Sequence, residues 1–326
     1  MTVLITAAGA VTEDPEATAP HPDTTPRPHW FDPAAHLGRR GWKYFSPATR
    51  YLLAAGNQAL GRRHDDPPLT GAAAERFGVV TGTQYAIARV HREMDGIITS
   101  EGVQGISPAQ VPGFSMNTPG SQLAISTGAQ AFSVTLTNPV TAGLEAVHFA
   151  ATALRTGRAD RVVAAATDQA PEQGDQYDAA AAVVLSTGRT AESGDEASVL
   201  ATVTGGICRF VPAGTGDGGR DAAALAAGAA RIAALAGAAD EVRLVVSGPA
   251  AAVPFATAVR DGCAKALADA GVTVRDLGTV RQARHCAVSG LLELVALALE
   301  GGPALVVSVS ESGHLAAIGL NNSPRS

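Results

Sequence analysis

Thr135-Leu-Thr-Asn-Pro-Val-Thr-Ala-Gly-Leu-Glu-Ala-Val-His-Phe-Ala150 is the stretch that decides the fold of this chain. The apolar and β-branched run from Phe132 to Thr137 favours a buried strand. Asn138-Pro139 ends that strand with a sharp turn. Apolar residues then recur at helical spacing from Leu144 to Ala151. The stretch therefore predicts a strand–turn–helix elbow.

The tip of this elbow is the position at which many α/β enzymes carry a nucleophile. The turn holds the side chain clear of the sheet, and the helix N-terminus stabilises its anionic form. Here the tip is Val140, which has no nucleophilic atom. The sequence thus predicts the scaffold of a catalytic site without the group that would react.

The composition is that of a globular α/β protein. The chain has 326 residues, is 46% hydrophobic and carries a net charge of −6. This length allows one large α/β domain or two fused halves, and the acidic balance argues against a broad nucleic-acid surface. Cys208, Cys263 and Cys286 lie far apart without metal-type spacing, which favours structural thiols in a reducing compartment.

The first ten residues lack the basic region of a signal peptide, and no apolar run is long and pure enough to span a bilayer. We therefore expect a soluble, cytoplasmic protein.

Gly78-Val-Val-Thr-Gly-Thr83 lacks the lysine of a P-loop and the glycine spacing of a dinucleotide fingerprint. We expect no cofactor and no metal ion.

Strand and helix patterns alternate in two similar series, which suggests a duplicated α/β unit. We expect an N-terminal half over residues 1–206 and a shortened C-terminal half over residues 207–326. A glycine-rich loop at Gly214–Gly219 marks the change of composition between them. In the first half, Ser46 is expected to cap a helix that has Pro47 at its first position.

The two ends of the chain carry further strand signals. A short strand is expected over Val3–Thr6, with its exit at Ala7-Ala8-Gly9-Ala10 and a loop over Val11–His29 after it. Near the other end, a strand is expected over Val280–Cys286, and a hairpin is expected from the strands Ala304–Val309 and Leu315–Leu320.

Two further features of the first half bear on function. A strand over Phe77–Val80 ends at Thr81-Gly82-Thr83, and a helix with Ala86, Ile87 and Val90 on one face is expected to follow. A basic cluster precedes the helix at Pro47 and is formed by Arg39, Arg40, Lys43 and Arg50. This cluster is either an ordinary solvated surface or a docking patch for an acidic partner.

Together these features resemble the β-ketoacyl synthase (ketosynthase) family of the thiolase fold, most strongly from Gly78 to Gly206. The segments that carry the resemblance are Gly41–Arg50 ahead of a helix, the Gly-rich strand end Phe77–Thr83, Val111-Pro112 followed by Asn117, the elbow Val134–Ala150 with Gly143 after its tip, and Gly157–Asp160 with Asp178–Leu185. The resemblance implies an α/β thiolase-like fold, in which two duplicated strand–helix halves pack as a five-layer αβαβα arrangement.

A working ketosynthase needs a cysteine thiolate that accepts the acyl chain, together with two histidines that assist malonyl decarboxylation. By resemblance, Val140 stands at the cysteine position, and Ser247–Ala250 stands at the first histidine motif without a histidine. The second motif falls near Arg284-His285, which makes His285 a displaced candidate and Arg281 a candidate for the family lysine. The resemblance therefore implies no catalytic residue at the elbow.

A ketosynthase-like chain without its nucleophile resembles a chain-length factor. In that group the inactive subunit pairs with an active ketosynthase as a heterodimer, completes its acyl tunnel and so limits the length of a polyketide or fatty chain. The implied tunnel residues are Thr83, Ala86, Ile87, Val90, Gln110, Val111 and Phe114, and the implied interface residues are Pro112 and Asn117. An acyl carrier protein is the second implied partner, and no nucleic acid or membrane is expected.

The sequence also departs from this group. Aromatic-type chain-length factors carry a glutamine where this chain has Val140, and the short second half favours reduced, polyene-type systems. Two alternatives stay open: an enzyme of the same fold with chemistry relocated to His285, His314 or Glu311, and a purely structural scaffold subunit. For His285, His148 and His314 the simpler interpretation is an ordinary structural histidine.

Overall fold

The computed structural model describes residues 1–13, 30–108, 111–171, 175–188, 199–212 and 220–321. Gln110, residues 14–29 of the expected N-terminal loop and the glycine-rich loop at 214–219 lie outside this part of the chain. Within the described residues, no helix has both the length and the apolar character needed to cross a membrane.

A mixed sheet of 11 strands is the frame of the described residues, with the order β3-β2-β4-β5-β1-β6-β11-β10-β7-β8 and with β9 paired to β7. The strands are β1 (Val3–Thr12), β2 (Phe77–Gly82), β3 (Phe132–Leu136), β4 (Arg161–Asp168), β5 (Ala179–Thr187), β6 (Ala201–Phe210), β7 (Glu241–Gly248), β8 (Thr273–Arg275), β9 (Arg281–Gln282), β10 (Ala304–Val309) and β11 (His314–Asn321). Residues 3–5 of β1 pair with residues 201–203 of β6 and so join the two sides of the sheet.

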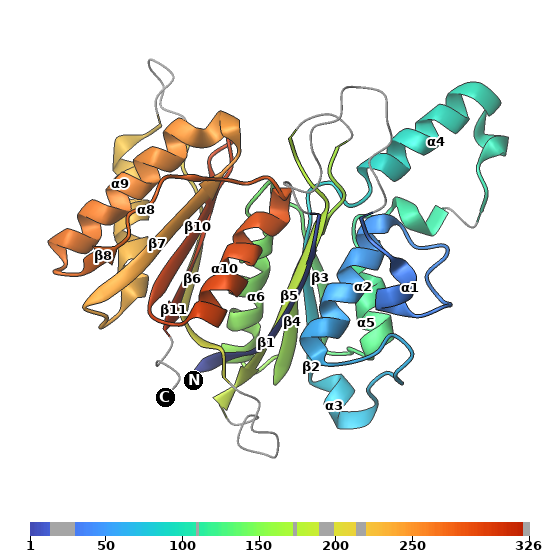
Figure 1. Cartoon of the computed structure of the whole chain (residues 1–326), viewed down its shortest axis with the longest axis horizontal. Helices are drawn as coiled ribbons and strands as arrows, with labels where there is room; N and C mark the ends of the chain where they lie inside the picture. Colours follow the sequence, from blue (N-terminus) through green and yellow to red (C-terminus); the bar gives the residue numbers. More distant parts are fainter. Residues whose placement is uncertain (14–29, 109–110, 172–174, 189–198, 213–219, 322–326) are drawn as a thin grey trace.

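Helices cover both outer faces of the sheet and fill the space between its two sides (Figure 1). The α-helices are α1 (Pro33–Leu37), α2 (Pro47–Leu60), α3 (Gly71–Glu75), α4 (Ala88–Glu101), α5 (Thr118–Thr127), α6 (Ala142–Arg155), α8 (Ala222–Ala233), α9 (Val253–Asp269) and α10 (Ser289–Glu300). Short 3₁₀ helices are η1 (Val103–Gly105), η2 (Val111–Phe114), η3 (Ala234–Ala236), η4 (Ala250–Ala252) and η5 (Cys286–Val288).

Three hydrophobic clusters hold these layers together. The central cluster joins α6 and α10 to both sides of the sheet. A second cluster packs α2 and α5 on the side formed by β1 to β5, and a third packs α8 and α9 on the side formed by β6 to β11. The order of layers is therefore helix, sheet, helix, sheet, helix, and most of the buried side chains are Ala, Val and Leu.

The strand order is the same on the two sides of the β1–β6 pairing. From the outer edge inward, one side runs β3-β2-β4-β5-β1 and the other runs β8-β7-β10-β11-β6. On each side the two outer pairs are parallel and the next two are antiparallel. Residue 206, at which we expected the halves to divide, lies inside β6.

Several predicted elements are confirmed. Helix α2 begins at Pro47, and Ser46 Oγ accepts a hydrogen bond of 3.4 Å from the backbone N–H of Thr49, as an N-cap does. Helix α6 follows the turn at Asn138-Pro139, and its inner face is buried. Strands β10 and β11 form the expected antiparallel hairpin.

Other predictions are wrong in their bounds. Strand β1 continues through Ala7-Ala8-Gly9-Ala10, which we expected to be its exit. Helix α4 begins only at Ala88, so Ala86 and Ile87 lie in the turn before it. The strand expected over 280–286 is limited to β9, and 286–288 form η5.

Candidate functional site

The elbow is formed as the sequence predicts, and its tip is conformationally unusual. Val140 has a φ of 64°, in the left-handed region that β-branched residues rarely enter. It is one of three non-glycine residues with positive φ in the described chain, the others being Asp276 and Cys286. Such backbone strain persists only where the surroundings fix the conformation.

A carboxylate in the first turn of α6 fixes the elbow from one side. Glu145 accepts hydrogen bonds from Nδ2 of Asn138, at 3.0 and 2.8 Å, and from Oγ1 of Thr141, at 2.6 Å. Glu145 is only 8% exposed, so these bonds are largely shielded from water. The residues before and after the tip are thereby held to the same helix.

The end of β2 lies directly against the start of α6. A Cβ at Gly82 would lie 2.4 Å from the carbonyl carbon and oxygen of Ala142, so no larger residue fits without movement of the backbone. This close approach places the turn after β2, residues 83–87, beside the elbow. Gln84 in this turn reaches the tip, because its Oε1 accepts a 3.1 Å hydrogen bond from the backbone N–H of Val140.

The turn is held in place by Asp168, the last residue of β4. Its Oδ1 accepts hydrogen bonds from Oγ1 of Thr83 at 2.8 Å and from the backbone N–H groups of Gln84 at 2.8 Å and Tyr85 at 2.6 Å. Its Oδ2 accepts a 2.9 Å bond from the backbone N–H of Ala287. One carboxylate therefore joins β4, the turn after β2 and η5.

Asp168 is fully buried, and this affects its ionisation. Burial raises the pKa of Asp168 to about 6, while the hydrogen bonds from Tyr85, Gln84, Ala287 and Thr83 act in the opposite direction. The carboxylate form remains the major species at neutral pH, because that pH is above the raised pKa.

Cys286 lies next to this network but is not a nucleophile at the elbow tip. It has a φ of 50° and is 1% exposed. Burial raises the pKa of the Cys286 thiol, and the neighbouring carboxylate of Asp168 adds to the shift, so the thiolate is disfavoured. The neighbouring Ala287 carbonyl packs on Gly143, where an added Cβ would lie 2.4 Å from the oxygen.

The structure also locates the histidines that the sequence singled out. His285 Nε2 lies 3.3 Å from the backbone oxygen of Glu13, and burial lowers the pKa of its imidazole. His148 Nδ1 faces Gly206 on β6, and His314 Nδ1 is hydrogen-bonded to Oγ of Ser312 at 2.9 Å. These contacts fit structural roles for all three side chains.

The residues expected to line a tunnel are partly brought together. Thr83 belongs to the Asp168 network, and Ala86 and Ile87 are buried in one cluster with Ala48, against which Met116 packs. Val90 and Phe114 are half-buried and do not belong to this cluster, and Val111 is 52% exposed. Of the expected interface residues, Asn117 is exposed just before α5. Pro112 belongs to η2.

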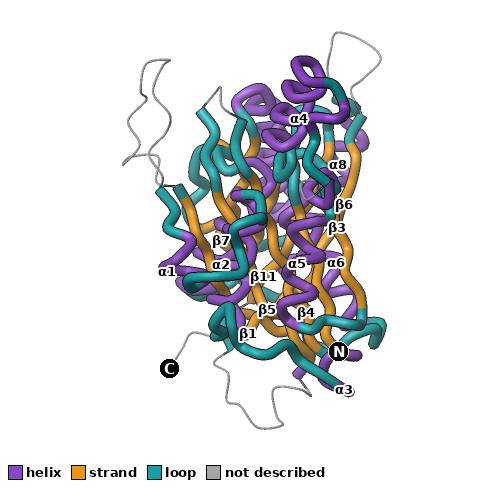
Figure 2. The backbone as a smooth tube through the Cα atoms, turned by 90° about the vertical axis from the view of Figure 1, so that its right-hand side faces the viewer, coloured by secondary structure: helices purple, strands orange, loops and turns teal. Residues whose placement is uncertain are grey.

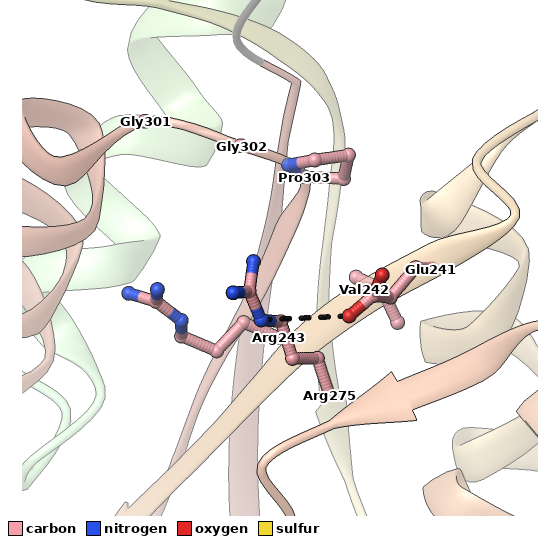
Figure 3. Close-up of a pocket in the computed structure, with 7 residues that line it drawn as sticks. All are labelled: Glu241, Val242, Arg243, Arg275, Gly301, Gly302 and Pro303. Carbon is pink, nitrogen blue, oxygen red and sulfur yellow. Dashed lines mark ion pairs between the residues drawn. The ribbon is translucent and has the colours of Figure 1, made fainter. Parts of the chain in front are cut away.

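A shallow surface depression lies at a different end of the molecule (Figure 3). It is lined by Glu241, Val242, Arg243, Arg275, Gly301, Gly302 and Pro303. Its two guanidinium groups are already paired, that of Arg275 with Glu241 at 3.5 Å and that of Arg243 with Glu300. The depression is at the first residues of β7, whereas Ser247 and Gly248, where we expected the family's first histidine motif to begin, are its last residues.

Three residues of this site were not predicted from the sequence: Gln84, Glu145 and Asp168. For Asp168 a signal was present, because a charged residue ends the otherwise apolar stretch Val162–Thr167 and such a residue needs buried partners. Glu145 had a weaker signal as an acidic residue in the first helical turn. Nothing in the local sequence distinguishes Gln84.

Comparison with known proteins identifies the family of this chain. The model of the β-ketoacyl synthase N-terminal domain matches residues 13–208, so the chain belongs to the β-ketoacyl synthase family. No match was found among curated proteins.

Solved structures extend the likeness to the whole chain. A type II polyketide synthase acyl-carrier protein in complex with its ketosynthase bound to the hexaketide (AntDE:AntF) matches with a TM-score of 0.75 at 18% identity, over 99% of each chain. The ishigamide ketosynthase/chain length factor matches with a TM-score of 0.71 at 21% identity, over 99% of each chain. An oxazolomycin ketosynthase domain (OzmH KS8) of Streptomyces albus JA3453 matches with a TM-score of 0.65 at 15% identity, over 99% of this chain and 96% of that chain. The fold is thus the mixed α/β, thiolase-like fold of ketosynthases throughout.

Proposed function

We propose that this chain is a non-catalytic chain-length factor that pairs with an active ketosynthase of a type II polyketide or fatty-acid synthase. The observation that carries the proposal is the elbow itself: its geometry is complete, and its tip is the valine Val140. A ketosynthase accepts its acyl chain on a thiolate at the elbow. This chain offers none there, because two of its cysteines, Cys263 and Cys286, are buried elsewhere and the third, Cys208, lies on β6.

A continuous surface supports a heterodimer. Strand β3 is the edge of the sheet and is paired on one side only, with β2. Helix α5 packs beside β3, η2 packs on α5 and α4, and α4 lies beyond the strand ends (Figures 1 and 2). Exposed apolar side chains mark this region: Ile98, Val103, Val111 and Ile125. An unpaired strand edge beside exposed apolar residues is a surface that a partner subunit would cover.

The same region supports the proposed role in chain length. In α4 only Met94 is buried, so the other side chains of this helix are at least partly exposed. The cluster of Ala48, Ala86 and Ile87 is joined to the Asp168 network by the 3.1 Å hydrogen bond from the backbone N–H of Ala86 to Thr83 Oγ1. Met116, between η2 and α5, packs against this cluster. We infer that the partner's acyl tunnel ends against this cluster, with Thr83, Ala86, Ile87, Val90, Val111 and Phe114 as its lining and Pro112 and Asn117 at the interface. The small side chains of Thr83 and Ala86 would leave a deep tunnel.

The basic segment before α2 supports docking of an acyl carrier protein. Arg39, Arg40 and Lys43 are exposed, and the neighbouring Tyr44 is 84% exposed. The backbone oxygen of Ala48 accepts a 2.8 Å hydrogen bond from Thr167 Oγ1, so the start of α2 lies at the same end of the sheet as Asp168. We infer that this segment attracts an acidic carrier protein by charge complementarity.

We further infer that the chain contains a duplicated unit. The repeated strand order and strand directions support this division. The N-terminal and the shortened C-terminal halves would then meet just before β6 rather than at residue 206.

Co-expression with a candidate ketosynthase, followed by size-exclusion chromatography and mass spectrometry, tests the proposal. A one-to-one complex, with a ketosynthase that is insoluble or inactive alone, would support it. A homodimer of this chain that turns over an acyl thioester without a partner would contradict it and favour relocated chemistry. A complex whose product length ignores tunnel substitutions would instead indicate a structural scaffold.

A further inference from the structure

The backbone N–H of Val140 is the group at the elbow that would meet an acyl substrate. The elbow uses its other N–H groups internally: Thr141 donates to the oxygen of Pro139 at 2.7 Å and Ala142 to that of Asn138 at 3.2 Å. In acyl-transfer enzymes the backbone N–H of the nucleophile residue itself can bind the carbonyl oxygen and stabilise the oxyanion that forms from it, and Val140 stands at the corresponding tip of this elbow.

In this chain that N–H already has a partner. Its hydrogen-bond acceptor is Oε1 of Gln84, at 3.1 Å. Because the donor is a backbone N–H, the acceptor atom must be the carbonyl oxygen of the Gln84 amide. That oxygen belongs to the same chemical class as the carbonyl oxygen of an acyl thioester.

The Gln84 side chain is held firmly in this position. The backbone N–H groups of Gln84 and of Tyr85 are both bound to the fully buried carboxylate of Asp168. Gln84 and Tyr85 are both half-buried, in the turn that lies against the elbow. The backbone of Gln84 is therefore fixed where its side chain reaches Val140.

We propose that Gln84 is a built-in occupant of the elbow, whose amide carbonyl takes the place of a substrate's acyl carbonyl. The proposal rests on the non-catalytic role proposed above and deepens it. Two changes, and not one, then separate this chain from an acyl-accepting subunit: Val140 removes the nucleophile, and Gln84 occupies the carbonyl-binding N–H. A thiol restored at the tip would still compete with Gln84 for the substrate.

The test uses the full chain carrying Val140→Cys, with hexanoyl-coenzyme A as the probe and intact mass as the readout. The thiolate that this substitution places at the elbow tip attacks the thioester carbonyl carbon. The bond between that carbon and the coenzyme A sulfur breaks, and coenzyme A leaves as a thiol with the proton that the new cysteine lost. The chain gains one hexanoyl group.

Adding Gln84→Met keeps the length of the side chain and removes the carbonyl. We expect Val140→Cys/Gln84→Met to be acylated about five to ten times faster than Val140→Cys alone, the effect of freeing one neutral hydrogen-bond donor. Gln58→Met is the matched control, because Oε1 of Gln58 also accepts a backbone N–H, that of Ala10, at 3.1 Å and away from the elbow. Equal rates for Val140→Cys with and without Gln84→Met would overturn the proposal.

A second measurement does not depend on a new thiol. In the chain that keeps Val140, Gln84→Met should increase amide hydrogen exchange at Val140 about fivefold, since it removes the acceptor of that N–H. Unchanged exchange at Val140 would also overturn the proposal. Both measurements are made on this chain alone, without a partner subunit. A failure to form a heterodimer would therefore contradict the proposed function but would change neither result.

Discussion

The backbone N–H of Ala287 donates a 2.9 Å hydrogen bond to Oδ2 of Asp168, although the two residues are 119 positions apart in the sequence. This bond ties η5, in the second half of the chain, to the end of β4, in the first. The other oxygen of the same carboxylate holds the turn from which Gln84 reaches Val140. The turn that carries Gln84 to the elbow therefore depends on the buried carboxylate of Asp168, while Glu145 holds the elbow itself.

We expect Asp168→Ala to destabilise the chain strongly. The substitution leaves the backbone N–H groups of Gln84, Tyr85 and Ala287 buried without an acceptor, and the loss of such partners should lower the free energy of unfolding by about 3 kcal/mol or more. Urea unfolding followed by circular dichroism measures the change. Asp160→Ala is the control, because its ion pair with Arg76 is about half exposed and screened by water, so its loss should lower the free energy of unfolding far less. Equal losses in the two variants would contradict this role of Asp168.

The raised pKa of Asp168 predicts an unusual pH dependence. Because its pKa is about 6 in the folded chain and about 3.9 in an unfolded one, the folded state binds this proton first as the pH falls. Because the folded state then binds more protons than the unfolded state, the contribution of Asp168 to the free energy of unfolding increases as the pH falls. The same contribution is lost as the pH rises through 6. Between pH 7 and 5 the gain should be about 1.3 kcal/mol.

Comparison with Asp168→Asn isolates this effect, because asparagine has a similar shape and does not titrate in this range. Urea unfolding at each pH gives the free energy of unfolding of both chains. The value for the original chain minus the value for the variant should increase as the pH falls from 7 to 5. A difference that is constant with pH would show that Asp168 has the same pKa in both states.

Local sequence chemistry predicted the elements whose ends are set locally. Ser46 and Pro47 define the start of α2, and Asn138-Pro139 defines the break before α6, because capping and turn formation depend on neighbouring residues. Strand β1 was expected to end near Ala7, yet it continues because α2 packs directly on it. A Cβ at Gly9 would lie 2.4 Å from the oxygen of Ala55, so the glycine permits this contact rather than ending the strand.

The candidate site was predicted less completely, because its contacts are long-range. The position of Val140 at the tip of the elbow follows from the sequence around it. The hydrogen bond of Val140 to Gln84 joins residues 56 positions apart, and no local pattern indicates it. The start of α4 was misplaced for the same reason, since Asp168 binds the N–H groups of Gln84 and Tyr85 and so holds residues 83–87 in a turn.

Restoring a thiol at the elbow should not create a condensing enzyme. Val140→Cys would add a thiol at the tip, but Ser247–Ala250, the expected position of the family's first histidine motif, contains no histidine, and His285 Nε2 lies 3.3 Å from the backbone oxygen of Glu13. We therefore expect the purified variant to release no carbon dioxide from malonyl-acyl carrier protein above the rate of the original chain. Decarboxylation that depends on the new cysteine would contradict the non-catalytic assignment.

Filling the proposed tunnel end should shorten the products of the complex. Ala86 is fully buried beside Ala48 and Ile87, so a larger side chain there reduces the space in which an acyl chain could end. We expect Ala86→Leu to shorten the longest products and Ala86→Trp to shorten them further, as measured by mass spectrometry of acyl carrier protein-bound products.

Ala72→Trp is the matched control for this experiment, because Ala72 is exposed on α3. It should leave the product length unchanged. If Ala86→Leu gives a stable complex with unchanged products, the cluster around Ala86 does not limit chain length.

A charge on the proposed interface should separate the subunits without unfolding the chain. Ile125 on α5 is 67% exposed, so Ile125→Asp disturbs little in the isolated chain but would bury an unpaired carboxylate in a heterodimer. We expect the Kd of the complex with the ketosynthase to rise at least about tenfold, as the loss of a central apolar contact does. Leu299→Asp on α10 is the matched control, because Leu299 is 58% exposed away from β3 and α5. Both substitutions add the same charge. A loss of binding that occurs only with Ile125→Asp would indicate that the ketosynthase contacts α5. Equal affinities of the two variants for the ketosynthase would indicate that it binds elsewhere.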